Sequence, residues 1–142
     1  MSTSAITLTL YGAILGVAAL AWFRGGPPER IGGLLNLIAT ALVLGAHLII
    51  GPGALPTFLL VIDGLLAFGF LGLALRYASL WLGGTMLLQG VQFSLHAYYL
   101  VTDRRFDLMY AVVNNVVSWG LVTCILAGTL GVWRKTLRVK AV

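Results

Sequence analysis

The chain has 142 residues, of which 60% are hydrophobic and 9% are charged, and its mean hydropathy is +1.00. Soluble domains carry about 25% charged residues, so a chain of this size and composition could not hide its apolar surface from water, and we expect it to lie in lipid. The net charge of +5 does not indicate nucleic-acid binding, because the basic residues stand at the ends of apolar runs. Since Cys124 is the one cysteine, an intrachain disulfide and a cysteine metal cluster are both excluded.

Five apolar runs, each close to the roughly 20 residues that span a bilayer, predict five transmembrane helices. They cover about 5–23, 31–50, 56–75, 79–101 and 108–133, and a basic tail follows at 134–142. The first run has no basic region before it and is longer than the apolar part of a signal peptide, so we expect a membrane helix there. The glycines and prolines of RGGPPER and GPGALP end the first and second runs. The prediction is an all-α integral membrane protein with a single polytopic domain over 1–142.

The basic residues predict how this domain is oriented. One set of helix ends carries seven of them: Arg24, Arg30, Arg76, Arg134, Lys135, Arg138 and Lys140. The opposite ends carry Arg104 and Arg105, whose charges Asp103 and Asp107 offset. The positive-inside rule therefore predicts an N-terminus outside and a C-terminus in the cytoplasm, in a bacterial-type inner (plasma) membrane.

Polar residues interrupt four of the five apolar runs at similar depths. Asp63 lies within FLLVIDGLLAFGF, where a charge costs about 2.5–3.5 kcal/mol unless it is protonated, paired or hydrated. Helical periodicity places Gln89, Gln92 and His96 on one face of the fourth run. We expect a buried polar centre in the outer half of the bilayer, made of Asp63, His47, His96, Gln92, Asn114 and Asn115. The structural alternative is that these residues only hydrogen-bond the helices to one another.

Glycines at helical spacing indicate where helices pack closely. Gly12 and Gly16 form GxxxG in the first run, and Gly120 and Gly128 share a face of the fifth. Small residues let helix backbones approach within lipid. We expect packing within the chain, and the alternative is a homo-oligomer interface, for which the first helix is the best candidate.

The sequence has no GxSxG, HExxH, P-loop or dinucleotide-binding pattern, so we expect a protein that is not an enzyme rather than an enzyme. Three functional hypotheses remain. The first is transport or permeation of protons, cations or a small polar solute. In this hypothesis Asp63 binds a proton or cation, and His47 and His96 relay protons. The second is an accessory or assembly subunit of a larger membrane complex. The third is a redox subunit, in which His47 and His96 ligate haem b or another metal, or a quinone binds. The first two need no cofactor, and the expected partners are the lipid bilayer and other membrane subunits.

Overall fold

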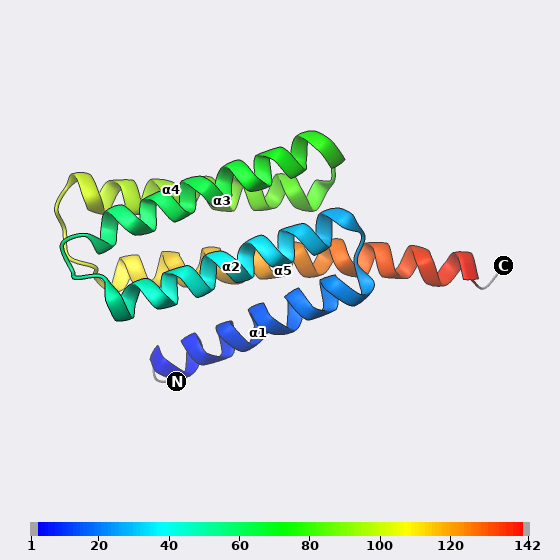
Figure 1. Ribbon diagram of the computed structural model, residues 1–142, viewed down its shortest axis with the longest axis horizontal. Coiled ribbons are helices and arrows are strands. Elements are labelled where there is room, and N and C mark those ends of the chain that lie inside the picture. The colour runs from blue at the N-terminus through cyan, green and yellow to red at the C-terminus, as the bar shows by residue number, and fades with distance from the viewer. Residues whose placement is uncertain (1–2, 141–142) are drawn as a thin grey trace.

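The computed structural model describes residues 3–140, and this part of the chain consists of five helices (Figure 1). They are α1 (Thr3–Arg24), α2 (Pro27–Ile49), α3 (Leu55–Tyr77), α4 (Leu80–Val101) and α5 (Leu108–Lys140). The predictions of an all-α fold and of five helices are confirmed. Four of the helices, α1, α2, α3 and α5, are long and apolar enough to cross a membrane, which supports a multi-pass membrane protein.

Helix α4 is as long as α1, at 22 residues, but unlike the other four helices it has no continuous stretch apolar enough to be identified as a membrane span. The cause is its polar stripe, because Gln89, Gln92 and His96 recur along one face. All three side chains are buried against neighbouring helices, so the outer surface of α4 is apolar at residues such as Leu87 and Val91.

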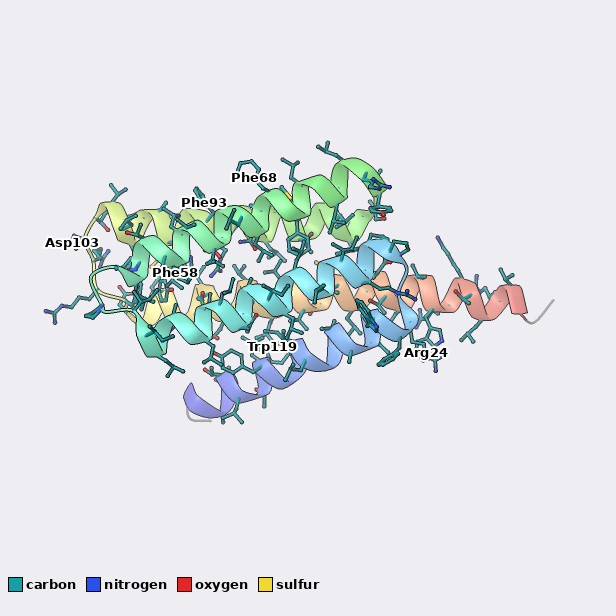
Figure 2. All side chains as sticks on the ribbon, viewed as in Figure 1. Arg24, Phe58, Phe68, Phe93, Asp103 and Trp119 are labelled. Atoms are coloured by element: carbon teal, nitrogen blue, oxygen red, sulfur yellow. The ribbon has the colours of Figure 1, made fainter. Side chains whose placement is uncertain are left out.

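The helices are arranged as a ring in chain order. Each helix contacts the next, α5 closes the ring on α1, and α2 also touches α5 across it. Figure 1 shows the α1–α2 and α3–α4 connections at one end of the bundle, where α5 extends beyond the other helices. The α2–α3 and α4–α5 connections lie at the opposite end. Figure 2 places Arg24 at the first end and Asp103 at the second.

An apolar cluster fills the interior of the bundle in the half of its length that is nearer to Arg24. Its buried members are Ala21, Leu66, Phe70, Leu73, Leu82, Val117, Leu121 and Ile125. We call these eight residues the apolar plug. They come from α1, α3, α4 and α5, so the plug holds four helices together.

The four glycines singled out by their spacing fall into two groups. A Cβ at Gly120 would lie 2.8 Å from Leu88, and one at Gly128 would lie 2.6 Å from Trp81, so these glycines let α4 and α5 approach closely. Gly12 and Gly16 are exposed on α1, and no atom of another described helix lies within 4 Å of a Cβ built on either. These two therefore do not pack against another helix of the chain.

The helix ends differ from the sequence-based ranges at two places. Helix α2 begins at Pro27 rather than near 31, because proline is tolerated in a first turn and Glu29 caps that turn by accepting a hydrogen bond from the Gly26 N–H at 3.0 Å. Helix α5 continues to Lys140, so the described part of the basic tail is helical. Its straight-chain basic residues favour helix, and neither glycine nor proline interrupts them. Residues 141 and 142 lie outside the described part.

Candidate functional site

Side chains from all five helices line one cavity of about 300 Å³, which lies inside the bundle toward the end opposite the apolar plug. This volume holds several water molecules or a small solute. All six residues of the expected polar centre line it: His47, Asp63, Gln92, His96, Asn114 and Asn115. Leu66 and Leu121 belong both to the cavity wall and to the plug, so the polar cavity ends on the apolar cluster. At the other side it reaches the molecular surface, because His47 is exposed.

Asp63 and His96 form the centre of the site. The two residues are 7% and 4% exposed, and Oδ2 of Asp63 is hydrogen-bonded to Nδ1 of His96. On the far side of the imidazole, Nε2 lies 2.6 Å from the hydroxyl of Tyr110. On the far side of the carboxylate, Gln89 donates its Nε2 hydrogens to Oδ1 at 3.3 Å and to the backbone carbonyl of Asp63 at 3.2 Å. A continuous hydrogen-bonded row thus joins α5, α4 and α3.

Two proton arrangements satisfy this row. With a neutral imidazole, Tyr110 donates to Nε2 and the Nδ1–H donates to Asp63. With an imidazolium, both ring nitrogens donate, and Tyr110 accepts. Asp63 accepts in both arrangements, so His96 can gain or lose one proton while its contacts with Asp63 and Tyr110 are kept. This is the chemistry expected of a proton-exchanging pair.

A second polar contact joins α4 to α5 beside the first. Gln92 donates its Nε2–H to Oδ1 of Asn114 at 2.5 Å. The Oε1 atoms of Gln89 and Gln92 are buried and have no hydrogen-bond partner among the described residues. Gln89 donates to two oxygens of Asp63, and these two bonds fix the orientation of its amide group. The Oε1 atoms of both glutamines are therefore enclosed among protein atoms.

His47 lines the cavity without joining the row. Its Nδ1 is bonded to the carbonyl of Val43 at 2.8 Å, one turn back on α2. The proposed pairing of His47 with His96 as haem ligands gains no support from this geometry, because both ring nitrogens of His96 are held by Asp63 and Tyr110. Within residues 3–140, no group of three or more histidine, cysteine, aspartate or glutamate side chains is arranged to hold a metal ion.

The α4–α5 connection forms an ordered rim beside the cavity. Tyr99 donates its hydroxyl to Oδ1 of Asp107 at 2.5 Å, and the same oxygen accepts the Tyr110 N–H at 3.0 Å, which caps α5. These two hydrogen bonds, the one from Tyr99 above all, lower the pKa of Asp107. Phe106 stacks on the Tyr110 ring with centroids 4.1 Å apart. The rim thus fixes the ring that contacts His96.

Two members of the row were not among the expected site residues. Gln89 lies on the same helical face as Gln92 and His96, so its spacing in the sequence could have predicted that it belongs to the site. Tyr110 stands near a helix end and resembles an ordinary interfacial aromatic, and nothing in its spacing distinguished it. Glu29 was also missed: it is 2% exposed at the other end of the bundle and accepts the Trp81 Nε1–H at 2.9 Å.

Comparisons of the chain with family models, with curated proteins and with solved structures find no significant match.

Proposed function

We propose that all five helices cross the membrane, α4 included. The polar stripe that lowers the hydropathy of α4 is buried inside the ring, so lipid would meet mainly its apolar surface. Polar groups that face the interior of a bundle avoid most of the cost of insertion.

The proposed orientation has the N-terminus outside and the C-terminus in the cytoplasm of a bacterial-type inner membrane. Arg24, Arg76 and the basic end of α5 lie at the end of the bundle that holds the plug, as the positive-inside rule requires of a cytoplasmic end (Figure 1). The cavity then opens outward, and the plug separates it from the cytoplasm.

In this orientation we propose that the protein transports protons or a small cation through the cavity. The observation that carries the proposal is the hydrogen-bonded Asp63–His96 pair in the wall of a polar cavity inside an apolar bundle. Buried ionisable groups within membrane helices are costly, and where they line a polar cavity they typically serve ion or proton pathways. Asp63 would bind the cation or proton, and His96 would exchange protons with the cavity through the Tyr110 hydroxyl, which takes up one proton as it passes another on.

Transport requires that the plug open on occasion, because it closes the cytoplasmic side of the cavity in this conformation. Leu66 on α3 and Leu121 on α5 form the floor, and they lie one and two turns from the cavity's polar residues Asp63 and Asn114. Binding of a proton or cation at Asp63 would alter its hydrogen bond to His96, which joins α3 to α4 directly above this floor. Small shifts of packed helices are a common form of such gating.

The test is proton or cation flux into proteoliposomes loaded with a pH-sensitive dye. Wild-type protein should dissipate an imposed gradient faster than protein-free vesicles, and Asp63→Asn should reduce the flux to the protein-free level. Ser94→Ala is the matched control, because Ser94 lies on α4 but is exposed and bonds only to the Gly90 carbonyl among the described residues. Absence of wild-type flux under every gradient, or unchanged flux in Asp63→Asn, would contradict the proposal.

The second candidate function is a subunit of a larger membrane assembly. The observation that favours it is the exposed face of α1, which carries Gly12 and Gly16 together with Leu8 and Leu15, and these two leucines are 73% and 58% exposed. Such a face suits a helix from another subunit or a second copy of the chain. Native mass spectrometry after mild detergent extraction tests it: a strictly monomeric protein would count against this function.

A further inference from the structure

A second buried carboxylate lies at the end of the bundle that holds the apolar plug. Glu29, in the first turn of α2, is 2% exposed. Its Oε2 accepts the Gly26 N–H at 3.0 Å, which caps α2, and its Oε1 accepts the Trp81 Nε1–H at 2.9 Å. The bond from Trp81 joins α2 to α4, two helices that do not pack against each other in the ring. Glu29 and Trp81 thus connect opposite sides of the bundle.

Trp81 reaches Glu29 because two glycines leave room for its ring. A Cβ built on Gly32 of α2 would lie 2.9 Å from Cη2 of the indole, and one built on Gly128 of α5 would lie 2.6 Å from its Cδ1. The ring is therefore in close contact with both helices, and a side chain at either glycine would collide with it. Trp81 stands in the first turn of α4 and packs against the plug. It therefore covers the plug at the end of the bundle marked by Arg24 (Figure 2).

We propose that Glu29 and Trp81 form a gate that closes the cavity on the side of the C-terminus. Since α2 and α4 face each other across the interior of the ring, a solute that passed the plug would meet the indole between them. While the hydrogen bond holds, the two helix ends stay together and the ring stays in the gap. When the bond breaks, the indole can leave, and the plug loses the layer that covers it. This inference rests on the proposed transport function for its role in the cell, but closure of one side can be measured without flux.

The strength of the Glu29–Trp81 bond suits a gate. Both oxygens of Glu29 accept an N–H, as an ionised carboxylate does, and its charge stands at the N-terminal end of α2, where the helix dipole stabilises it. A hydrogen bond to a charged group contributes enough to change an equilibrium about tenfold or more. Loss of this bond should therefore raise the population of the open gate by at least about that factor.

Two variants break the bond in different ways. Trp81→Phe removes the N–H and keeps an aromatic ring in the gap. Glu29→Asp withdraws the carboxylate by one methylene and keeps its charge in the first turn of α2. Thr129→Val is the matched control, because Thr129 is 0% exposed, follows Gly128 directly, and donates its hydroxyl to the Ile125 carbonyl within α5.

The readout is the rate at which a membrane-impermeant thiol reagent labels Asn115→Cys in the cavity, in a Cys124→Ala background, from each side of oriented vesicles. Each rate reports how often the cavity is open to that side. Relative to this parent protein, each gate variant should be labelled at least about tenfold faster from the side of the C-terminus, and at an unchanged rate from the other side. The double variant should match Trp81→Phe, because both changes remove the same bond. Thr129→Val should match the parent protein on both sides.

Unchanged labelling from the side of the C-terminus in both gate variants would overturn the inference. An equal rise from both sides, or the same rise in Thr129→Val, would also overturn it, since either result indicates a general loosening of the fold. These outcomes separate the two proposals. A one-sided rise without wild-type flux rejects transport and keeps the gate, whereas wild-type flux with unchanged labelling rejects the gate alone.

Discussion

Asp63 on α3 and His96 on α4 are hydrogen-bonded to each other in the interior of an apolar bundle, with exposures of 7% and 4%. The pairing explains how a carboxylate is accommodated within FLLVIDGLLAFGF. Each residue provides the other with a partner that lipid cannot supply, and Gln89 and Tyr110 complete the hydrogen bonding at the two ends.

Removal of one partner of this pair should destabilise the fold strongly. We expect Asp63→Ala and His96→Ala each to lower the free energy of unfolding by about 3 kcal/mol, because each leaves a buried polar group unpaired. The double variant should be less destabilised than the sum of the two, by about 1 kcal/mol or more. Equilibrium unfolding in mixed micelles, followed by tryptophan fluorescence, measures this coupling. Strict additivity would show that the two side chains do not interact.

The two groups of glycines should respond differently to the same substitution. Gly128→Ala places a Cβ 2.6 Å from the Trp81 ring, so we expect a loss of about 1–3 kcal/mol from overpacking. Gly12→Ala meets no atom of another described helix within 4 Å and gains helix propensity of up to about 1 kcal/mol, so it should be neutral or stabilising. Thermal unfolding of the two variants compares them directly. Equal destabilisation would mean that α1 packs closely against another helix or another subunit at Gly12.

Ala78 is the clearest case of backbone strain in the described chain. It ends α3 with φ 46° and ψ 42°, a left-handed conformation that costs an L-residue roughly 1–2 kcal/mol and that glycine adopts readily. Ala78→Gly should therefore stabilise the protein by about 1 kcal/mol. Ala74→Gly, one turn earlier within the same helix, is the control and should destabilise by a similar amount. A loss of stability in Ala78→Gly would contradict the assigned conformation.

The rim of the cavity should respond to acid through Asp107. Hydrogen bonds from Tyr99 and from the Tyr110 N–H lower the pKa of this carboxyl below its ordinary value of 3.8. A lowered folded-state pKa stabilises the fold above pH 3.8, and this contribution is lost as the pH falls through the folded-state value. We expect Asp107→Asn to show a flatter fall in thermal stability below pH 4 than the wild type does. Arg104→Gln is the control, because its contact with Asp107 is an exposed one at 3.7 Å and should matter little. Identical acid profiles for Asp107→Asn and wild type would remove Asp107 from this role.

The helices and the polar stripe of α4 could be predicted from the sequence because both depend on local periodicity. Gln92 and His96 share a face by spacing alone, and the structure buries that face. The partner of Asp63 could not be chosen in the same way. Spacing gives the phase of one helix, but the rotation and axial shift of α3 against α4 decide that His96, rather than His47, reaches the carboxylate.

Other differences have equally local causes. Glu29 was not predicted as a buried residue because Pro27 and Pro28 indicated a connection between two helices. Proline is compatible with a first helical turn, however, and α2 begins at Pro27. Gly12 and Gly128 have the same small-residue signature, and their opposite environments arise from which face of α1 and α5 turns inward. The row through Tyr110 depends on the fold of the α4–α5 connection, which no periodicity describes.

In the proposed orientation, water reaches the cavity around Asp63 and His96 from the side of the N-terminus. The direct measurement is the labelling of Asn115→Cys, in a Cys124→Ala background, by a membrane-impermeant thiol reagent added to one side of oriented vesicles. Asn115 lines the cavity, and Thr123→Cys on the exposed surface of α5 is the control that should stay unlabelled in lipid. We predict labelling of Asn115→Cys from the outer side only. Labelling from the cytoplasmic side alone, or from neither side, would contradict a cavity that opens to the outside.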